Sequence, residues 1–451
     1  MRIIIVTEQY LPMLGGVATV TRNLSQDLAA AGHTVRVVAP SETHHNERAQ
    51  DGAVTVRRYP SFEWPSYDGL RIAFPPVAPL RRLFARFRPD VVHLHSPIVL
   101  GNVAQFLAAA RHVPVVATNH YMPENMSPAL STDPLLGRSF DTLAYSYLVS
   151  FYNRCDYVTA PTAYALALLR EHGLEAPGRA VSNGIDLAAF APRSRDEALR
   201  RRLGLPADRP LILYVGRLSE EKRVSVLLDA MAQVRAPAHL VIGGAGPQAE
   251  ELAQRARDLE LAERVTFLGR VPDDELVPLY RLADVFAMPS TAELQSLSTL
   301  EALAVGLPVV AANAGALPEL VRDRVNGLHF APEDSAELSE RLTRLVTHPA
   351  QRRRMALAAS ATAAAHDRQR ITEEWPRVYA AAAASMRERA RRRLATRAWS
   401  EASRWAKRVS TGASQRQRIT RRLRPAMRRR AGTRTLRRQR RAPETGPQPT
   451  A

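Results

Sequence analysis

Unbroken apolar runs alternate with amphipathic stretches along most of the chain. The first run, RIIIVT at residues 2–7, is β-branched and uninterrupted, which is typical of a buried strand in a parallel sheet. A Gly-Gly loop, an amphipathic stretch that ends at Gly32 and a second apolar run at 34–39 follow it. This order predicts a βαβ unit.

The alternation continues through the first half of the chain and starts again near Arg209. The first series predicts further strands at 90–95, 113–120 and 157–162. The second repeats strand, loop and helix in PLILYVGRLSEEKRVSVLLDAM, AHLVIGGAGPQAEELAQRA and VTFLGRVPDDELVPLYRLADVFAMPS. We therefore expect an α/β protein with two doubly wound, Rossmann-like domains that face a central cleft, where such folds bind ligands.

These two series also predict where the domains begin and end. Residues 1–180 would form an N-terminal domain and 181–365 a C-terminal domain, with a hinge near 179–193. Residues 366–390 are helical in pattern, and we expect them to pack back on the N-terminal domain. Residues 391–451 are rich in arginine and are expected to be disordered.

Cysteine use and hydropathy favour a cytoplasmic protein. The 451 residues include one cysteine, Cys155, so no disulfide can form within the chain, and a reducing compartment fits. The N-terminus lacks the pattern of a secretory signal, and no window approaches the ~20 apolar residues of a membrane span. Membrane association is expected to be peripheral, at the inner face of the plasma membrane.

The formal net charge of +19 is concentrated at the C-terminal end. Residues 387–451 contain 21 Arg, one Lys and three Glu, so the rest of the chain is neutral. Because Trp399 and Trp405 lie among the arginines, this segment suits an anionic membrane surface. Nucleic acid binding and a disordered, solubilising tail are the alternatives.

The only lysine outside that segment lies in a candidate anion site. Lys222 and Arg217 follow a predicted strand in VGRLSEEK, near the start of a helix. Two cations beside a helix N-terminus can bind a phosphate, with Arg as a bidentate donor and Lys as a point charge. The alternative is an ordinary solvated helix start.

Two glutamates flank a second helix start, in PSTAELQSLSTLEALAVGLPVV at 289–310. Glu293 lies in the loop and Glu301 in the helix. The backbone amides of Gln295, Ser296 and Leu297 between them lack helical partners. Two acceptors on either side of an anion site suit a nucleotide diphosphate sugar, which has hydroxyls at both ends. The alternative is two unrelated surface carboxylates.

Two glycine pairs also lie between a predicted strand and a helix. Gly15 and Gly16 would allow a ligand to approach the backbone, or would form a plain tight turn. Gly244 and Gly246, in GGAGP, would allow close packing or contact with a nucleotide.

These motifs together resemble a known family. GRLSEEK, GAGP, FLGRV and the E-x7-E pattern resemble the C-terminal half of the retaining group 1 glycosyltransferases, family 4, which have the GT-B architecture. GGV, DVVHLHSP, ATNH and SNGID resemble the N-terminal half. The resemblance extends over roughly residues 1–385, in order.

The resemblance implies a role for each candidate residue. Glu301 would bind the ribose hydroxyls, and Glu293 the hydroxyls of the transferred sugar. Arg217 and Lys222 would hold the diphosphate, and His120 would lie against the donor sugar. The remaining donor contacts would come from Gly15 and Gly16 near the diphosphate and from the backbone of Arg270 and Val271 at the base.

The implied reaction is transfer of a hexose from a UDP- or GDP-linked donor with retention of configuration. Fixed cations and helix-start amides would stabilise the departing phosphate, so no metal or other cofactor is expected. The acceptor hydroxyl would attack from the face of the leaving group, without a protein nucleophile. His93 and His95 alternate along a buried strand, and we interpret them as structural rather than as a metal pair.

Two stretches indicate which acceptor is used. Ser296 stands where the family usually has glycine, and TAELQSL and NHYMPENM are similar to the branch that glycosylates lipids. We expect a membrane lipid acceptor, such as diacylglycerol or a phosphatidylinositol glycolipid. A soluble acceptor (a sugar or inositol phosphate) and a nucleic-acid-binding protein acting through its tail are the alternatives. A GT-B-like epimerase or phosphorylase is a weaker one.

Overall fold

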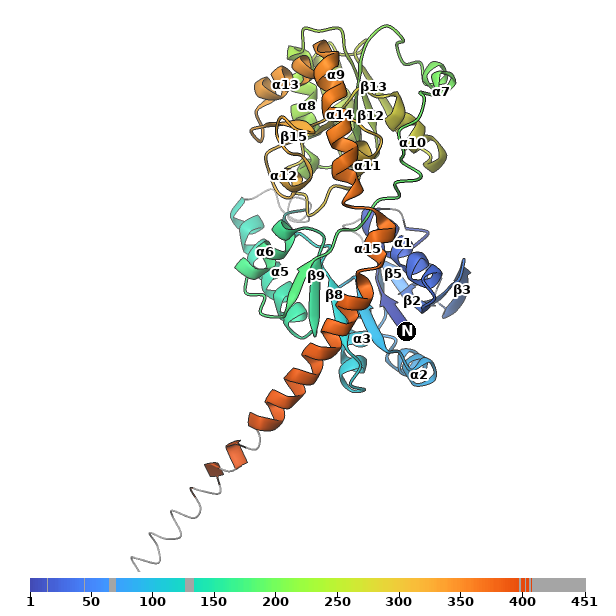
Figure 1. The fold of residues 1–451 in the computed structure, drawn as a ribbon, viewed down its shortest axis with the longest axis vertical. Helices are drawn as coiled ribbons and strands as arrows, with labels where there is room; N and C mark the ends of the chain where they lie inside the picture. Colours follow the sequence, from blue (N-terminus) through green and yellow to red (C-terminus); the bar gives the residue numbers. More distant parts are fainter. Residues whose placement is uncertain are drawn as a thin grey trace, which may run out of the picture. The chain divides into compact units, whose positions relative to one another are not determined.

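A computed structural model of the chain describes residues 1–13, 15–43, 45–64, 70–125, 134–396, 399–401, 403, 404 and 407. The chain divides into two compact units, Met1–Met386 and Arg387–Ala451. Both large sheets belong to the first unit (Figure 1). No helix in the described ranges is long and apolar enough to cross a membrane.

The N-terminal sheet has eight strands in the order β10-β9-β8-β7-β1-β2-β4-β3. Every neighbouring pair is parallel except β3 and β4. The strands are β1 (Arg2–Val6), β2 (Thr34–Pro40), β3 (Glu47–Asp51), β4 (Val54–Tyr59), β7 (Val91–Leu94), β8 (Val115–Thr118), β9 (Tyr157–Ala160) and β10 (Gly178–Ala180). The five strands predicted in this half correspond to β1, β2, β7, β8 and β9.

Helices pack on both faces of this sheet, and a small hairpin lies beside it. The helices are α1 (Gly16–Ala30), α2 (Val77–Phe87), α3 (Val99–Ala109), η1 (Pro123–Asn125), α5 (Pro134–Asn153) and α6 (Ala163–Glu171). Strands β5 (Ser61–Glu63) and β6 (Arg71–Ala73) form the hairpin. α2 is amphipathic, because Leu80, Leu83, Phe84 and Phe87 are buried while its arginines face outward.

The C-terminal sheet has six parallel strands in the order β13-β12-β11-β14-β15-β16. They are β11 (Leu211–Val215), β12 (His239–Gly243), β13 (Val265–Gly269), β14 (Val285–Met288), β15 (Val309–Ala312) and β16 (Gly327–Phe330). The helices of this half are α7 (Glu197–Arg202), η2 (Glu220–Lys222), α8 (Val224–Gln233), α9 (Ala249–Asp258), α10 (Asp273–Leu282), α11 (Leu297–Ala304), α12 (Leu317–Leu320), α13 (Ser335–Thr347) and α14 (Pro349–Ala364). The predicted α/β class with two doubly wound sheets is confirmed.

The strand orders place a switch point in each sheet. In the C-terminal sheet the chain runs from β11 outward to β13 and then returns to β14 on the other side of β11. In the N-terminal sheet it leaves β1 towards β2 and returns to β7 on the other side of β1. Ligands of doubly wound folds bind beyond the carboxyl ends of the strands at such points. A ligand is therefore expected at the loops after β1, β7, β11 and β14.

The chain beyond α14 returns to the N-terminal sheet. It passes through α15 (Arg368–Thr372) into a helical stretch at 375–386. Ile371, Trp375 and Tyr379 belong to the same buried cluster as Ile3 and Ile5 of β1. Figure 1 shows this orange segment descending from α14 to α15, near α1. The domain limits inferred from the sequence stay a prediction.

Candidate active site

The switch point of the C-terminal sheet brings together a lysine and a glutamate that are far apart in sequence. η2 follows β11 and carries Lys222, whereas the loop after β14 carries Glu293. Lys222 Nζ donates to Glu293 Oε1 at 2.7 Å, and their side chains are only 19% and 9% exposed. The backbone of Thr291 donates to the Glu221 carbonyl, which joins the two segments. The fold thus brings a largely buried cation into contact with a largely buried carboxylate.

α11 begins directly after this loop, with Ser296 as its N-cap. The Ser296 hydroxyl accepts hydrogen bonds from the Thr299 amide at 3.3 Å and from its hydroxyl at 2.9 Å. Serine is a preferred N-cap, which explains its presence where the family usually has glycine. The amides at this helix start make it suitable for an anion.

Glu301 lies one turn into α11 and is partly exposed. Its Oε2 accepts a hydrogen bond of 2.7 Å from the hydroxyl of Tyr280, a fully buried residue of α10. Burial raises the pKa of Glu301 to about 7, and the hydrogen bond from Tyr280 opposes that rise. Tyr280 was not among the predicted residues, because its sequence context is that of an ordinary helix packing residue.

The predicted glycines Gly244 and Gly246 pack against the loop that carries Arg217. A Cβ on Gly244 would lie 1.8 Å from the Gly216 carbonyl oxygen, and one on Gly246 would lie 2.3 Å from that of Leu218. The Leu218 amide also donates to the Ala245 carbonyl at 3.0 Å. These glycines therefore allow two loops to approach closely and help to hold Arg217 in place. Their predicted contact with the donor stays a prediction.

Arg270 and Val271 follow β13, near the end of β12. Arg270 is exposed and Val271 is partly buried. Both line a small pocket together with Leu203, Leu268, Pro272, Glu275 and Leu279. The pocket combines apolar walls with an arginine, which suits a flat aromatic ligand.

The start of α1, in the N-terminal half, lies close to the start of α11. Gly15 has a φ of 146° and directly precedes α1. A Cβ on Gly16 would lie 3.5 Å from Leu297 Cδ1, at the first residue of α11. The predicted residues Gly15, Gly16 and Leu297 are thus brought together at the starts of α1 and α11.

His120 follows β8 and contacts a second histidine. Its Nε2 lies 2.8 Å from Nδ1 of His95, and the two rings stack. Burial lowers the pKa of His120 to about 4, so the ring is neutral at pH 7. No sequence pattern indicates this contact, because His95 alternates with His93 along a buried strand. In the described ranges, no group of three or more His, Cys, Asp or Glu residues could hold a metal ion.

Gln295 joins the loop after β14 to the segment that follows β10. Its side-chain oxygen accepts from the Asn183 amide at 2.9 Å, and its amide group donates to Ser182 Oγ at 3.0 Å. Thr162 Oγ1 donates to the Leu294 carbonyl at 2.7 Å. Thr162 and the segment after β10 therefore hold the loop that contains Glu293. Sequence reasoning assigned Gln295 only a backbone contact.

Two Rossmann-like sheets whose switch points face one site are the architecture of a GT-B glycosyltransferase. The family described as "Glycosyl transferases group 1" matches residues 195–362, and "Glycosyltransferase Family 4" matches residues 14–189. The chain therefore belongs to family 4 of the group 1 glycosyltransferases, which transfer a hexose with retention of configuration.

Individual relatives agree with this assignment. The chain is 33% identical over 364 residues to a GDP-mannose-dependent alpha-mannosyltransferase of Mycobacterium tuberculosis, with 79% of this chain and 90% of the relative covered. It is 30% identical over 345 residues to an alpha-monoglucosyldiacylglycerol synthase of Streptococcus pneumoniae, with 74% and 77% covered. Sucrose-phosphate synthase from Thermosynechococcus elongatus has the same fold, with a TM-score of 0.71, 23% identity and coverage of 84% and 98%.

Proposed function

We propose that the protein transfers a hexose from a UDP- or GDP-linked donor to a membrane lipid such as diacylglycerol or a phosphatidylinositol glycolipid. The observation that carries the donor part is the buried contact between Lys222 and Glu293 beside the start of α11. A ligand that places a phosphate beside a sugar hydroxyl can satisfy both side chains at once.

Each part of the donor has a matching group in this site. Lys222 and Arg217 bind the diphosphate, together with the amides at the start of α11. Glu293 accepts hydrogen bonds from the transferred sugar, and His120 contacts the same sugar. Glu301 accepts from the ribose hydroxyls. The base lies against the backbone of the two residues after β13, Arg270 and Val271.

The chemistry is stabilisation of a departing phosphate. The bond between the sugar C1 and the phosphate oxygen breaks while the acceptor oxygen bonds to C1 from the same face. The acceptor proton moves to the leaving phosphate oxygen. Lys222, Arg217 and the helix-start amides interact more strongly with the growing negative charge than with the ground state, which lowers the barrier. Because these cations are fixed in place, turnover is expected to persist in a strong chelator.

An exposed aromatic patch supports a lipid acceptor. The aromatic patch consists of Phe62, Trp64, Phe74 and Val77, which are 41–51% exposed. The ring of Phe62 lies 6.5 Å from that of Trp64 and 5.6 Å from that of Phe74. Contiguous exposed apolar groups mark interaction sites, and aromatic rings favour the bilayer interface.

Positive charge lies next to this patch. α2 begins at Val77, a member of the patch, and its next turn presents Arg81 and Arg82 to solvent. Basic residues near an anionic leaflet contribute about 1 kcal/mol each. Apolar and basic groups on one segment suit the surface of an anionic bilayer, where a lipid acceptor is found.

The donor site can be tested with two variants and one control. Lys222→Ala and Arg217→Ala should each lower kcat by about 10²–10³, as expected for loss of a preorganised group that stabilises charge in the transition state. Arg235→Ala, on an exposed arginine after α8, is the control for loss of a positive charge. Wild-type turnover in either site variant would place the phosphate site elsewhere.

The acceptor can be identified by offering lipid and soluble acceptors in separate reactions. Each nucleotide sugar that raises the melting temperature should be offered with diacylglycerol or phosphatidylinositol in vesicles, and separately with free sugars and inositol phosphate. Product in the lipid fraction is expected. Turnover with the soluble acceptors alone would refute the lipid assignment and leave the donor assignment intact.

A further inference from the structure

His95 lies directly behind the proposed catalytic histidine. It follows β7 and is 1% exposed. Its Nδ1 lies 2.8 Å from Nε2 of His120, with ring centroids 5.1 Å apart and planes 14° from parallel. One of these nitrogens must carry a hydrogen and the other a lone pair. Since Nε2 of His120 is engaged here, Nδ1 is the ring nitrogen left for a ligand.

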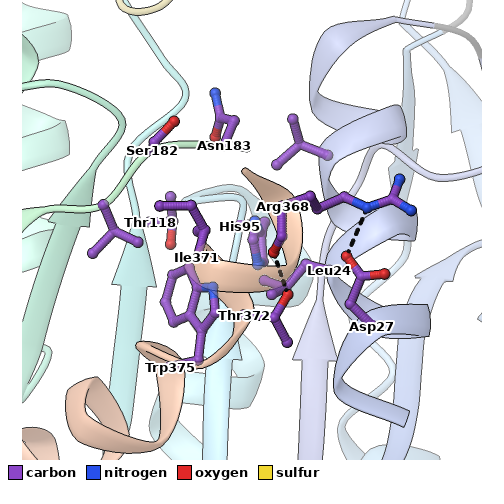
Figure 2. Close-up of a pocket in the computed structure, with 12 residues that line it drawn as sticks. Leu24, Asp27, His95, Thr118, Ser182, Asn183, Arg368, Ile371, Thr372 and Trp375 are labelled. Carbon is purple, nitrogen blue, oxygen red and sulfur yellow. Dashed lines mark hydrogen bonds and ion pairs between the residues drawn. The ribbon is translucent and has the colours of Figure 1, made fainter. Parts of the chain in front are cut away.

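His95 also lines a pocket, and its second ring nitrogen, Nε2, is buried. Among the described residues, none forms a hydrogen bond with His95 Nε2. Figure 2 shows His95 among the residues that line this pocket, with Thr118 on one side and Asp27 and Arg368 on the other. The remaining lining residues are Val20, Leu24, Val181, Ser182, Asn183, Ile371, Thr372 and Trp375. The pocket has room for a water molecule and offers several polar partners to it.

Burial, and to a lesser extent the neighbouring His93 and His120, keeps the His95 ring neutral. Asp27 of α1 forms an ion pair with Arg368 of α15, with 3.0 Å between Oδ2 and Nε. The ring of His93 lies 4.2 Å from that of His95, and burial lowers the pKa values of His93, His95 and His120. Each ring therefore carries one proton at pH 7, and the contact between His95 and His120 allows two arrangements of the protons of that pair.

We propose that His95 is a positioning residue that holds His120 in a single tautomer, with the proton of His120 on Nε2 and the lone pair of Nδ1 directed to a hydroxyl of the donor sugar. In this arrangement His95 accepts through Nδ1, so its own proton is on Nε2, the ring nitrogen for which none of the described residues is a hydrogen-bond partner. The Asp27 carboxylate lines that pocket and can accept this hydrogen through a water molecule. The opposite arrangement would direct a lone pair towards the carboxylate.

This inference rests on the proposed contact of His120 with the donor sugar. A histidine with its lone pair on Nδ1 accepts a hydrogen bond from a sugar hydroxyl, whereas the other tautomer can only donate one. Without an acceptor at Nδ1 of His95, His120 would populate both tautomers. The His95 side chain would thus act on the reaction without touching the substrate.

The tautomers can be read directly in the full-length protein. Long-range ¹⁵N–¹H NMR spectra of protein labelled at histidine distinguish a proton on Nδ1 from one on Nε2. His95→Asn and His120→Asn assign the two rings. We expect the proton on Nε2 in both His95 and His120. A proton on Nδ1 of His120 would overturn the proposal.

Two substitutions of His95 separate positioning from packing. His95→Asn keeps an acceptor near the place of Nδ1, whereas His95→Leu removes it. We expect His95→Leu to lower kcat by up to about 100-fold, as small misplacements at an active site can. The KM for the nucleotide sugar should change little, because the diphosphate and ribose contacts remain. His95→Asn should recover most of the rate and a single His120 tautomer.

The controls separate this inference from the proposed function. Melting curves check that both variants are folded, and the wild-type spectra test the tautomer of His120 even if His95→Leu fails to fold. If His120→Ala is inactive but His95→Leu has wild-type kcat, the positioning role is wrong. If His120→Ala itself has wild-type activity, the proposed contact of His120 with the donor is wrong.

Discussion

Glu301 illustrates how the environment of one side chain sets the pH at which a site works. Burial raises its pKa to about 7. Only the ionised carboxylate can accept hydrogen bonds from both ribose hydroxyls, so donor affinity should fall as pH decreases below 7. The loss should approach roughly tenfold per pH unit. Calorimetric titration of the wild type with UDP and GDP between pH 5.5 and 8 would measure it.

Variants of Glu301 and of its hydrogen-bond donor Tyr280 provide the controls. Glu301→Gln should bind the nucleotide more weakly and lose this pH dependence. Tyr280→Phe removes the hydrogen bond that opposes the rise in the pKa of Glu301, so it should move the transition to higher pH. An unchanged pH dependence in Glu301→Gln would mean that another group titrates.

Glu8 provides a prediction about stability rather than binding. It is 2% exposed, its Oε1 accepts from the Leu100 amide at 2.7 Å, and burial raises its pKa from 4.5 to about 7. Between these values the folded state binds more protons than the unfolded state. Protonation of Glu8 therefore stabilises the folded state. This stabilisation is fully present below pH 4.5 and is lost as pH rises through 7.

Glu8→Gln should remove that pH dependence. The amide keeps an oxygen for the Leu100 amide but does not ionise. The free energy of unfolding of the variant should exceed that of the wild type by roughly 2–4 kcal/mol at pH 8, with little difference near pH 4.5. Urea unfolding at both pH values would measure it. An equal difference at the two pH values would contradict ionisation of Glu8 as the cause.

At the scale of elements, the turn after β12 supports the loop after β11. A Cβ on Gly246 would meet the Leu218 carbonyl at 2.3 Å, so Gly246→Ala must push the two loops apart. This displacement moves Arg217, and we expect both kcat and nucleotide affinity to fall. Gly204→Ala is a suitable control, because its Cβ would have open space and only its φ of 66° is unfavourable. Equal effects of both variants on catalysis would refute a specific role for the turn.

At the scale of the whole molecule, the first unit is neutral and the second carries the charge. Residues 387–451 account for the entire excess of +19. The structure describes few residues of this segment. One of them, Trp399, is 77% exposed. The remaining residues of the predicted disordered tail, including Trp405, lie outside the described ranges.

Deleting residues 387–451 should lower turnover of an acceptor embedded in anionic vesicles and leave turnover of a soluble acceptor unchanged. Electrostatic attraction to the bilayer acts within a Debye length of ~8 Å at physiological salt, so membrane binding should weaken as salt is added. Vesicle flotation with and without anionic lipid would measure it. If the protein does not bind anionic vesicles but binds DNA with a steep salt dependence, the tail is a nucleic-acid-binding segment.

The central strands could be predicted from sequence because each is a continuous apolar run. β1, β7 and β14 are buried on both faces, so nearly all of their residues are apolar. The edge strand β3, by contrast, is mainly polar and exposed, and its place depends on antiparallel pairing with β4. No local pattern records that pairing, so the prediction did not include it.

The α/β class, the two doubly wound sheets and the family could all be inferred from the sequence, because apolar periodicity and glycine-rich turns are local properties of the chain. Which side chains meet depends instead on the folded arrangement. Lys222 contacts Glu293 because β14 returns beside β11, and His120 contacts His95 because β8 pairs with β7. Tyr280 of α10 reaches Glu301 of α11, 21 residues further along the chain. Such contacts depend on strand order and helix packing, which join residues that are distant in the chain.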